Sequence, residues 1–129
     1  MLALDYGAAR TGVAVSDATG TLARPLTVVE RAADAAGLKQ LVDLVAAEEV
    51  ERVVVGLPLT LRGERGAQVA ETERFVEALR AALDVPVESF DERFTTALAA
   101  STPSSRAPED ARAAAHLLES YLTWSSDRG

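Results

Sequence analysis

The chain has 129 residues, 48% of them apolar, which suits one compact domain and leaves little room for a second. It has no cysteine and a single histidine, and this excludes a disulfide framework, a thiol nucleophile and a metal site built from several histidines. The net charge of −7 argues against a protein that coats nucleic acid, although an enzyme whose carboxylates hold cations can still act on it.

Three short strands are expected at the start of the chain. Residues 2–5 are a short apolar run that ends in Asp5, and residues 11–16 alternate and are rich in valine and alanine. The segment between them has the length of a hairpin turn, in which Gly7 can adopt a positive φ. Residues 26–30, after Pro25, are a third strand. Two hairpins in series predict an antiparallel meander.

Helices and strands then alternate. In chain order we expect a helix at 38–45, a strand at 52–56, a helix at 69–83, a strand at 85–90, a short helix at 94–100 and a final helix at 111–122. Helical crossovers make the first, fourth and fifth strands parallel, with right-handed connections. The fold class is therefore α/β, with a mixed five-stranded sheet in the order 3-2-1-4-5 flanked by helices.

Acidic residues from three distant segments are predicted to meet at one edge of this sheet. Asp5 ends the first strand, Asp91 and Glu92 follow the fifth, and Asp110 opens the final helix. Sites in such sheets gather beyond the carboxyl ends of the parallel strands. Carboxylate oxygens there can hold Mg²⁺ or Mn²⁺, which generate hydroxide and stabilise the leaving oxygen when a phosphodiester is hydrolysed.

Each acid also has a purely structural interpretation. An aspartate at a strand end, such as Asp5, is a common turn residue. Asp91 suits the N-cap of the helix expected at 94–100. Asp110 lies in a first helical turn, where a carboxylate interacts favourably with the helix dipole. The expected convergence of these residues favours the functional interpretation.

Arginines surround the same edge in the predicted topology. Arg10 lies in the first hairpin, Arg62 and Arg65 follow the fourth strand, and Arg93 follows Glu92. Arginine forms bidentate contacts with phosphate, so these side chains are candidates for binding a nucleic-acid backbone. Scattered, solvated cations are an equally good explanation of their spacing alone.

Several motifs, in one order along nearly the whole chain, resemble the YqgF/RuvX family. The stretches that carry the resemblance are Leu4-Asp5-Tyr6-Gly7, Arg10-Thr11-Gly12-Val13-Ala14-Val15-Ser16-Asp17, Val55-Gly56-Leu57-Pro58-Leu59, Asp91-Glu92-Arg93 with Thr95-Thr96, and Asp110 before an alanine-rich helix that ends in Tyr121-Leu122. The family is similar to the RuvC Holliday junction resolvases in having an RNase H-like fold. Its members are described as candidate nucleases for the 5′ end of pre-16S rRNA, and earlier as Holliday junction resolvases.

The resemblance implies a single RNase H-like nuclease domain over residues 1–129. It implies that Asp5, Glu92 and Asp110 are both the catalytic acids and the ligands of Mg²⁺ or Mn²⁺. Asp91 and Gly7 are then expected to lie next to these acids and hold them in position, without binding the metal themselves. The fourth strand ends in Gly56-Leu57-Pro58 without an acid, so Glu92 must reach inward from the next strand.

Three functions stay open on the sequence alone. The first is a metal-dependent endonuclease for structured RNA in ribosome maturation, and the second is a nuclease for branched DNA, which would act as a symmetric homodimer. The third is a ribosome-associated binding module without metal. No apolar run approaches the ~18 residues of a membrane span, so we expect a cytoplasmic monomer or homodimer with no membrane partner.

Overall fold

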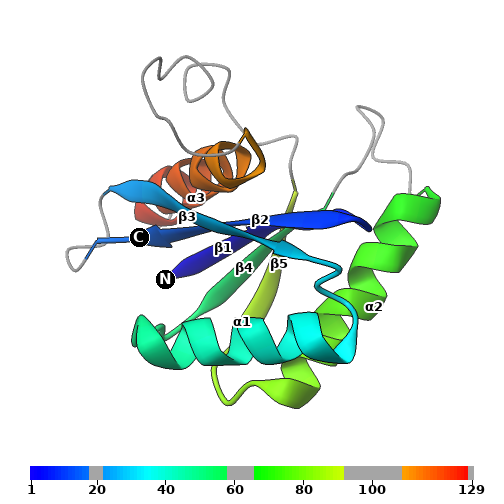
Figure 1. Ribbon diagram of the computed structural model, residues 1–129. Coiled ribbons are helices and arrows are strands. Elements are labelled where there is room, and N and C mark those ends of the chain that lie inside the picture. Colours follow the sequence, from blue (N-terminus) through cyan, green and yellow to red (C-terminus); the bar gives the residue numbers. More distant parts are fainter. Residues whose placement is uncertain (18–21, 58–65, 92–108, 128–129) are drawn as a thin grey trace.

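The computed structural model describes residues 1–17, 22–57, 66–91 and 109–127, and these contain five strands and three helices. The strands are β1 (Leu2–Asp5), β2 (Arg10–Ser16), β3 (Ala23–Glu30), β4 (Val53–Leu57) and β5 (Val87–Asp91), and the helices are α1 (Ala35–Ala47), α2 (Ala67–Ala82) and α3 (Glu109–Asp127). The strands form one sheet of order β3-β2-β1-β4-β5 (Figure 1). β2 is antiparallel to β1 and β3, whereas β1, β4 and β5 are parallel. The predicted strand order and directions are confirmed.

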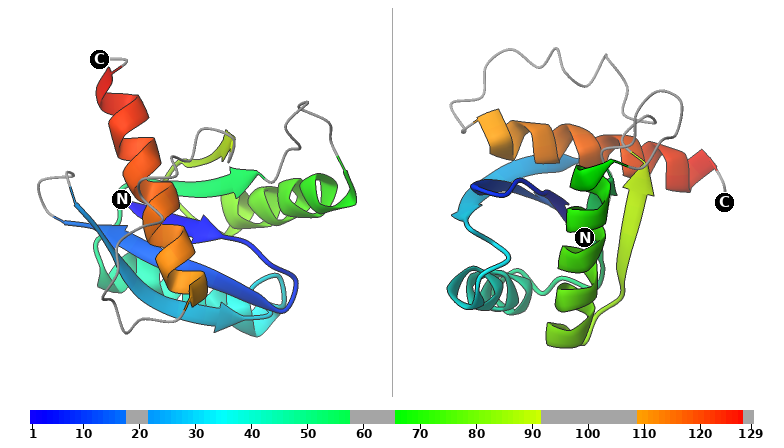
Figure 2. Two further views of the ribbon diagram at one scale, coloured as in Figure 1. Left: turned by 90° about the horizontal axis from the view of Figure 1, so that it is seen from above. Right: turned by 90° about the vertical axis from the view of Figure 1, so that its right-hand side faces the viewer.

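The two faces of the sheet are covered by different helices. Leu2 and Leu4 of β1 pack on the side of α1 and α2, and Ala3 between them packs on the side of α3. Figure 2 shows α3 alone on one side of the sheet and α1 on the other. Successive side chains of a strand point to opposite faces of the sheet. A strand that is covered on both faces therefore needs apolar residues at every position, and this explains the continuous apolar run at residues 53–55 of β4.

Small residues let α3 lie close to the middle of the sheet. Ala3 of β1 is paired in register with Ala14 of β2, and both are fully buried in the core under α3. The facing side of α3 carries Ala114 and Ala115 in the same core. Small side chains on both surfaces bring the two backbones together, and this positions the start of α3 over β2.

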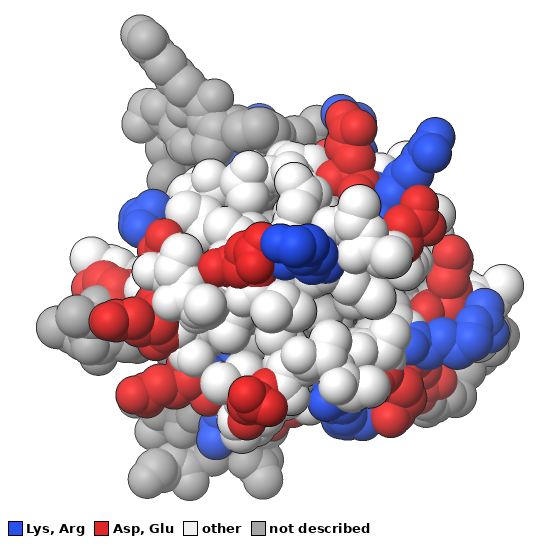
Figure 3. All heavy atoms as spheres, turned by 60° about the horizontal axis from the view of Figure 1, so that its bottom comes forward, with Lys and Arg blue, Asp and Glu red and all other residues white. Residues whose placement is uncertain are grey.

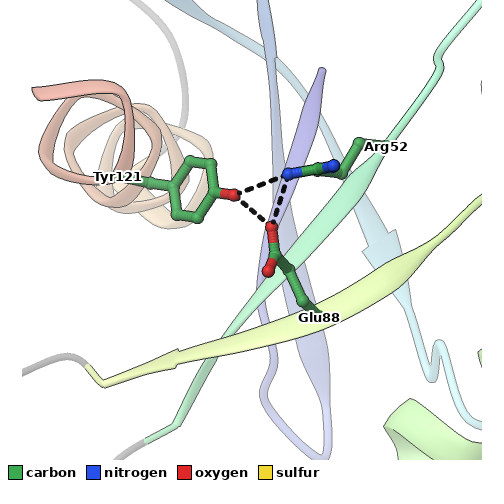
Figure 4. A network of polar contacts seen from close by, with 3 residues as sticks. All are labelled: Arg52, Glu88 and Tyr121. Carbon is green, nitrogen blue, oxygen red and sulfur yellow. Dashed lines mark hydrogen bonds and ion pairs between the residues drawn. The ribbon is translucent and has the colours of Figure 1, made fainter. Parts of the chain in front are cut away.

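The far half of α3 is attached to the sheet by a polar cluster (Figure 4). Arg52, just before β4, donates hydrogen bonds of 3.2 Å from Nη1 both to Glu88 Oε1 and to the hydroxyl of Tyr121. That hydroxyl in turn donates to Glu88 Oε1. Burial, followed by the hydrogen bond with Glu88, raises the pKa of the Tyr121 phenol, which therefore keeps its proton.

Some predicted boundaries were wrong. β3 begins at Ala23 rather than at residue 26 and contains Pro25, which is tolerated because β3 is an edge strand with a register irregularity opposite, between Val13 and Ala14. β5 begins at Val87, after Pro86, rather than at residue 85. The short helix expected at 94–100 lies outside the described residues. In the part of the chain that the structure describes, no helix is long and apolar enough to cross a bilayer.

Candidate active site

Asp5 is the last residue of β1, at the carboxyl end of the parallel strands, as predicted. It is partly exposed, whereas the three residues before it are buried. Strand alternation places Asp5 on the same face as Ala3, which is the face that α3 covers. Its partner in the β1–β2 register is Gly12.

Gly12 brings Asp110 to Asp5. A Cβ atom built at position 12 would collide with the backbone carbonyl of Asp110 and would also touch the backbone nitrogen of Ala111. The first turn of α3 therefore rests directly on the backbone of β2, at the residue paired with Asp5. Asp5 and Asp110, which are far apart in the sequence, thus lie on one face of the sheet, with Gly12 between them.

The β1–β2 turn depends on the small size of Gly7. A Cβ atom at position 7 would lie 2.5 Å from the carbonyl oxygen of Arg10. The Gly7 N–H donates to the Thr11 hydroxyl, and that hydroxyl donates back to the Gly7 carbonyl, both at 3.4 Å. The expectation that Gly7 is useful for its access to positive φ is not borne out, because its φ lies outside that region and the turn needs the missing side chain instead.

Arg10 begins β2 and forms an ion pair with Asp110. Its Nε lies 3.4 Å from Asp110 Oδ2, and the two side chains are 66% and 39% exposed. An exposed pair of this kind contributes little to stability. The pair does, however, hold an exposed guanidinium beside the Asp110 carboxylate.

Of the remaining predicted site residues, Asp91 lies within the described part of the chain. Asp91 ends β5 in register with Leu57 and is partly exposed. Phe90 packs in the core on the α3 side, so alternation puts Asp91 on the opposite face from Asp5. The others lie outside the described residues, and these are Glu92, Arg62, Arg65 and Arg93.

A hollow of about 120 Å³ adjoins Asp5. One wall is the turn of residues 5–8, and the other is the first part of α2, with Gln68, Glu71 and Thr72. None of these three α2 residues is among the functional residues predicted from the sequence. A signal was nonetheless present, because α2 follows the carboxyl end of β4 and its first turns carry polar side chains at helical spacing.

Tyr6 lies between the hollow and the core. Its ring stacks on Phe75 of α2, with the centroids 4.4 Å apart, and its hydroxyl is hydrogen-bonded to the Glu71 carboxylate. Burial, with the charge of Glu71 next, raises the pKa of the Tyr6 phenol, so the phenol stays protonated and donates. Tyr6 therefore fixes Glu71 at the wall of the hollow.

The described residues hold part of the predicted acidic cluster. Within these segments, no three side chains of the types His, Cys, Asp and Glu form a metal-binding group. The face on which α1 lies carries acidic and basic side chains intermixed, near its middle and along its margins, and no continuous basic surface is visible in this view (Figure 3). Of the predicted acids, Asp5 and Asp110 are the two that the described structure places on one face of the sheet, at the carboxyl ends of the parallel strands.

The strand order and the helix placement define a protein of the RNase H-like fold class. Two solved structures share this fold: the RuvC structure of Thermus thermophilus, with a TM-score of 0.66 and 17% identity, and that of T. thermophilus RuvC in complex with a Holliday junction substrate, with a TM-score of 0.69 and 15% identity. Each likeness covers 99% of this chain, together with 97% and 96% of the respective RuvC chains. Residues 1–124 match the family described as "RuvX: Holliday junction resolvase". The chain belongs to the RuvX family.

Relatives in this family share a name. A Chloroflexus aggregans protein is 50% identical over 99 residues, which are 77% of this chain and 70% of that protein. A Chloroflexus aurantiacus protein is also 50% identical, but the chain spans only 65% of its length. A Sulfurihydrogenibium protein is 37% identical over 95% of this chain and 88% of its own. Each is named "Putative pre-16S rRNA nuclease".

Proposed function

We propose that residues 1–129 form one metal-dependent endonuclease domain that hydrolyses phosphodiester bonds of structured RNA, at the 5′ end of pre-16S rRNA. The observation that supports the proposal is the close approach of the Asp110 backbone to Gly12, the register partner of Asp5, at the carboxyl ends of the parallel strands. The relatives' shared name supports the choice of RNA. The proposed place of action is the cytoplasm, at the ribosome precursor.

Asp5 and Asp110 suit a hard divalent cation. Both offer carboxylate oxygens, the ligands that Mg²⁺ and Mn²⁺ prefer, and both are partly exposed, so an ion can reach them from solvent. Glu92, directly after Asp91, is the proposed third ligand. When bound, such an ion supplies a hydroxide nucleophile and stabilises the charge on the leaving oxygen.

The chain's own groups orient the substrate in this proposal. Arg10 stands beside Asp110, and its exposed guanidinium can bind a phosphate oxygen as the backbone arrives. Arg62, Arg65 and Arg93 are proposed to extend this contact along the strand. Gly7 supports the geometry around Asp5 through the tight β1–β2 turn, whereas Asp91, on the opposite face of the sheet, has no direct part in this proposal.

A four-way DNA junction is the second candidate substrate. It is favoured by the printed family description and by the likeness in fold to RuvC. Cutting two strands of a junction symmetrically calls for two active sites, so this function requires a homodimer, whereas the RNA nuclease can act as a monomer.

One cleavage experiment separates these candidates. The purified chain is incubated with an RNA that spans the pre-16S 5′ end and with a four-way DNA junction, each with Mg²⁺, Mn²⁺ or EDTA. The proposal predicts metal-dependent cleavage of the RNA and loss of cleavage in EDTA. Cleavage of the junction alone would favour the second candidate. If neither substrate is cleaved with Mg²⁺, with Mn²⁺ or in EDTA, only an RNA-binding role would remain.

A further inference from the structure

We propose that the hollow beside Asp5 receives the ribose next to the scissile phosphate and that Glu71 selects RNA over DNA there through the 2′-hydroxyl. This inference rests on the proposed RNA nuclease function and adds to it a residue that selects the sugar. The hollow shares Asp5 with the proposed catalytic site and extends from there to α2.

The charge of the described lining favours a hydroxyl over a phosphate as the occupant of the hollow. Its described lining includes the carboxylates of Asp5 and Glu71 and no lysine or arginine. A phosphate would be repelled by these two groups, whereas a hydroxyl can donate to them. Since the phosphate must lie near Asp5, the group that enters the adjoining hollow is the one attached to it, the sugar.

The polar groups of α2 match a 2′-hydroxyl, which both donates and accepts. Glu71 accepts, and the exposed amide of Gln68 one turn earlier can donate. Thr72 is 2% exposed, and its hydroxyl already donates to the Gln68 carbonyl at 2.7 Å, so it stabilises this turn of the helix. The 2′-hydroxyl is the group by which a protein distinguishes RNA from DNA at a given nucleotide.

The hollow is of suitable size, and Glu71 is held in place. A volume of about 120 Å³ greatly exceeds the ~10–15 Å³ that one water needs, so several waters or one sugar ring can enter. The Tyr6 phenol, itself fixed by stacking on Phe75, donates to Glu71. A pre-positioned acceptor of this kind does not have to be ordered when the substrate binds.

The test uses one RNA substrate and copies of it that carry a single 2′-deoxynucleotide on either side of the cleaved bond. For the wild-type chain in Mn²⁺, one of the two substitutions should slow cleavage by about 10- to 100-fold, the value of a hydrogen bond to a charged group. Glu71→Ala should slow cleavage of the all-RNA substrate by a similar factor. It should also cleave the RNA and the deoxy-substituted copy at equal rates.

Two further variants control for charge and for folding. Glu77→Ala removes a carboxylate from the same helix, where it pairs with Arg80 outside the hollow, and it should keep the full preference for RNA. Glu71→Gln keeps the shape of the side chain and should lose part of the preference. The wild-type chain alone shows whether a 2′-hydroxyl affects the cleavage rate. The role of the 2′-hydroxyl can therefore be tested even if a variant fails to fold.

The outcomes for the hollow and for the nuclease are distinguishable. Equal wild-type rates on RNA and both deoxy-substituted copies, or an unchanged preference in Glu71→Ala, would overturn the role of the hollow and leave the nuclease intact. If the wild-type chain cuts no RNA, the proposed function fails. The Kd values of the same oligonucleotides in Ca²⁺, measured by fluorescence anisotropy, then test the hollow. A Kd for RNA equal to the Kd for both deoxy-substituted copies would overturn its role.

Discussion

Gly12 and Asp110 are in contact through their backbones, one in the middle of β2 and the other in the first turn of α3. Because Gly12 is also the register partner of Asp5, this contact places the backbone of Asp110 over the residue next to Asp5 in the sheet. The other half of α3 is held through Tyr121 by Arg52 and Glu88 (Figure 4). The helix is therefore fixed to the sheet near both of its ends, which makes the position of Asp110 a property of the fold.

Replacing Gly12 with alanine should damage both stability and activity. The new methyl group collides with backbone atoms of Asp110 that cannot rotate away, so α3 has to shift. Overpacking of this kind costs about 1–3 kcal/mol of the free energy of unfolding. Urea denaturation measures that loss. The cleavage rate per folded molecule should also fall, because the shift of α3 moves Asp110.

Gly66→Ser is the matched control. A Cβ atom at position 66 meets no atom of the described residues within 4 Å, and serine is a preferred residue at the N-cap of a helix, which Gly66 occupies in α2. Its stability should equal or exceed that of the wild type. If Gly12→Ala were as stable as Gly66→Ser, the close contact of β2 with α3 would not exist.

Arg10→Ala should weaken RNA binding without unfolding the protein. Its exposed pair with Asp110 contributes at most about 1 kcal/mol to stability. Loss of one phosphate contact should lower the slope of log K against log salt concentration by about 0.7–0.9. Arg24→Ala is a close control, because Arg24 forms a 3.4 Å pair with Glu48 and is 61% exposed. An identical salt slope for both variants would exclude Arg10 from phosphate binding.

Tyr121 should make stability depend on pH in the alkaline range. Burial, followed by the hydrogen bond with Glu88, raises the pKa of its phenol above the ordinary value of 10.0, so the folded chain keeps a proton that the unfolded chain releases. This contribution is complete below about pH 10 and is lost as the pH rises beyond it. Tyr121→Phe should be less stable by about 1 kcal/mol at neutral pH, and the difference should shrink above pH ~10. A difference that stays constant across this range would contradict the assignment.

A divalent cation should stabilise the folded chain. An ion bound only by the folded state at 100 times its Kd adds about 2.7 kcal/mol, which raises the melting temperature. Asp110→Asn should reduce the shift that Mn²⁺ produces in thermal denaturation. Asp43→Asn, on the exposed side of α1 where it pairs with Lys39, should leave the shift unchanged. Equal shifts in both variants would place the cation elsewhere.

Much of the fold follows from patterns that are local in the sequence. Alternation in the first hairpin and helical spacing at Leu38, Leu41 and Val45 predict their elements, and the length of the crossovers predicts the strand order. The start of β3 was missed because Pro25 is normally disfavoured in a strand, and only an edge position makes it acceptable. That position is a property of the assembled sheet.

The candidate site was only partly predictable. Asp5 and Asp110 could be chosen because strand ends and helix starts are visible in the sequence. The role of Gly12 was not, since it depends on how closely α3 approaches β2, a distance set by small residues on both surfaces such as Ala14 and Ala114. Glu71 was missed for the same reason, because its position at the hollow comes from the packing of Phe75 against Tyr6.

Single-turnover cleavage of a pre-16S 5′-end RNA in Mn²⁺ by wild type and Asp5→Asn tests the central claim most directly. The substitution keeps the shape of the side chain and removes one charge from the site, so stability should stay the same or rise as repulsion among the carboxylates falls. Cleavage should fall by at least about 100-fold, because the hydroxide and the leaving oxygen both depend on the bound ion. Asp43→Asn should cleave at the wild-type rate. An Asp5→Asn protein that is folded and cleaves as fast as the wild type would contradict the account.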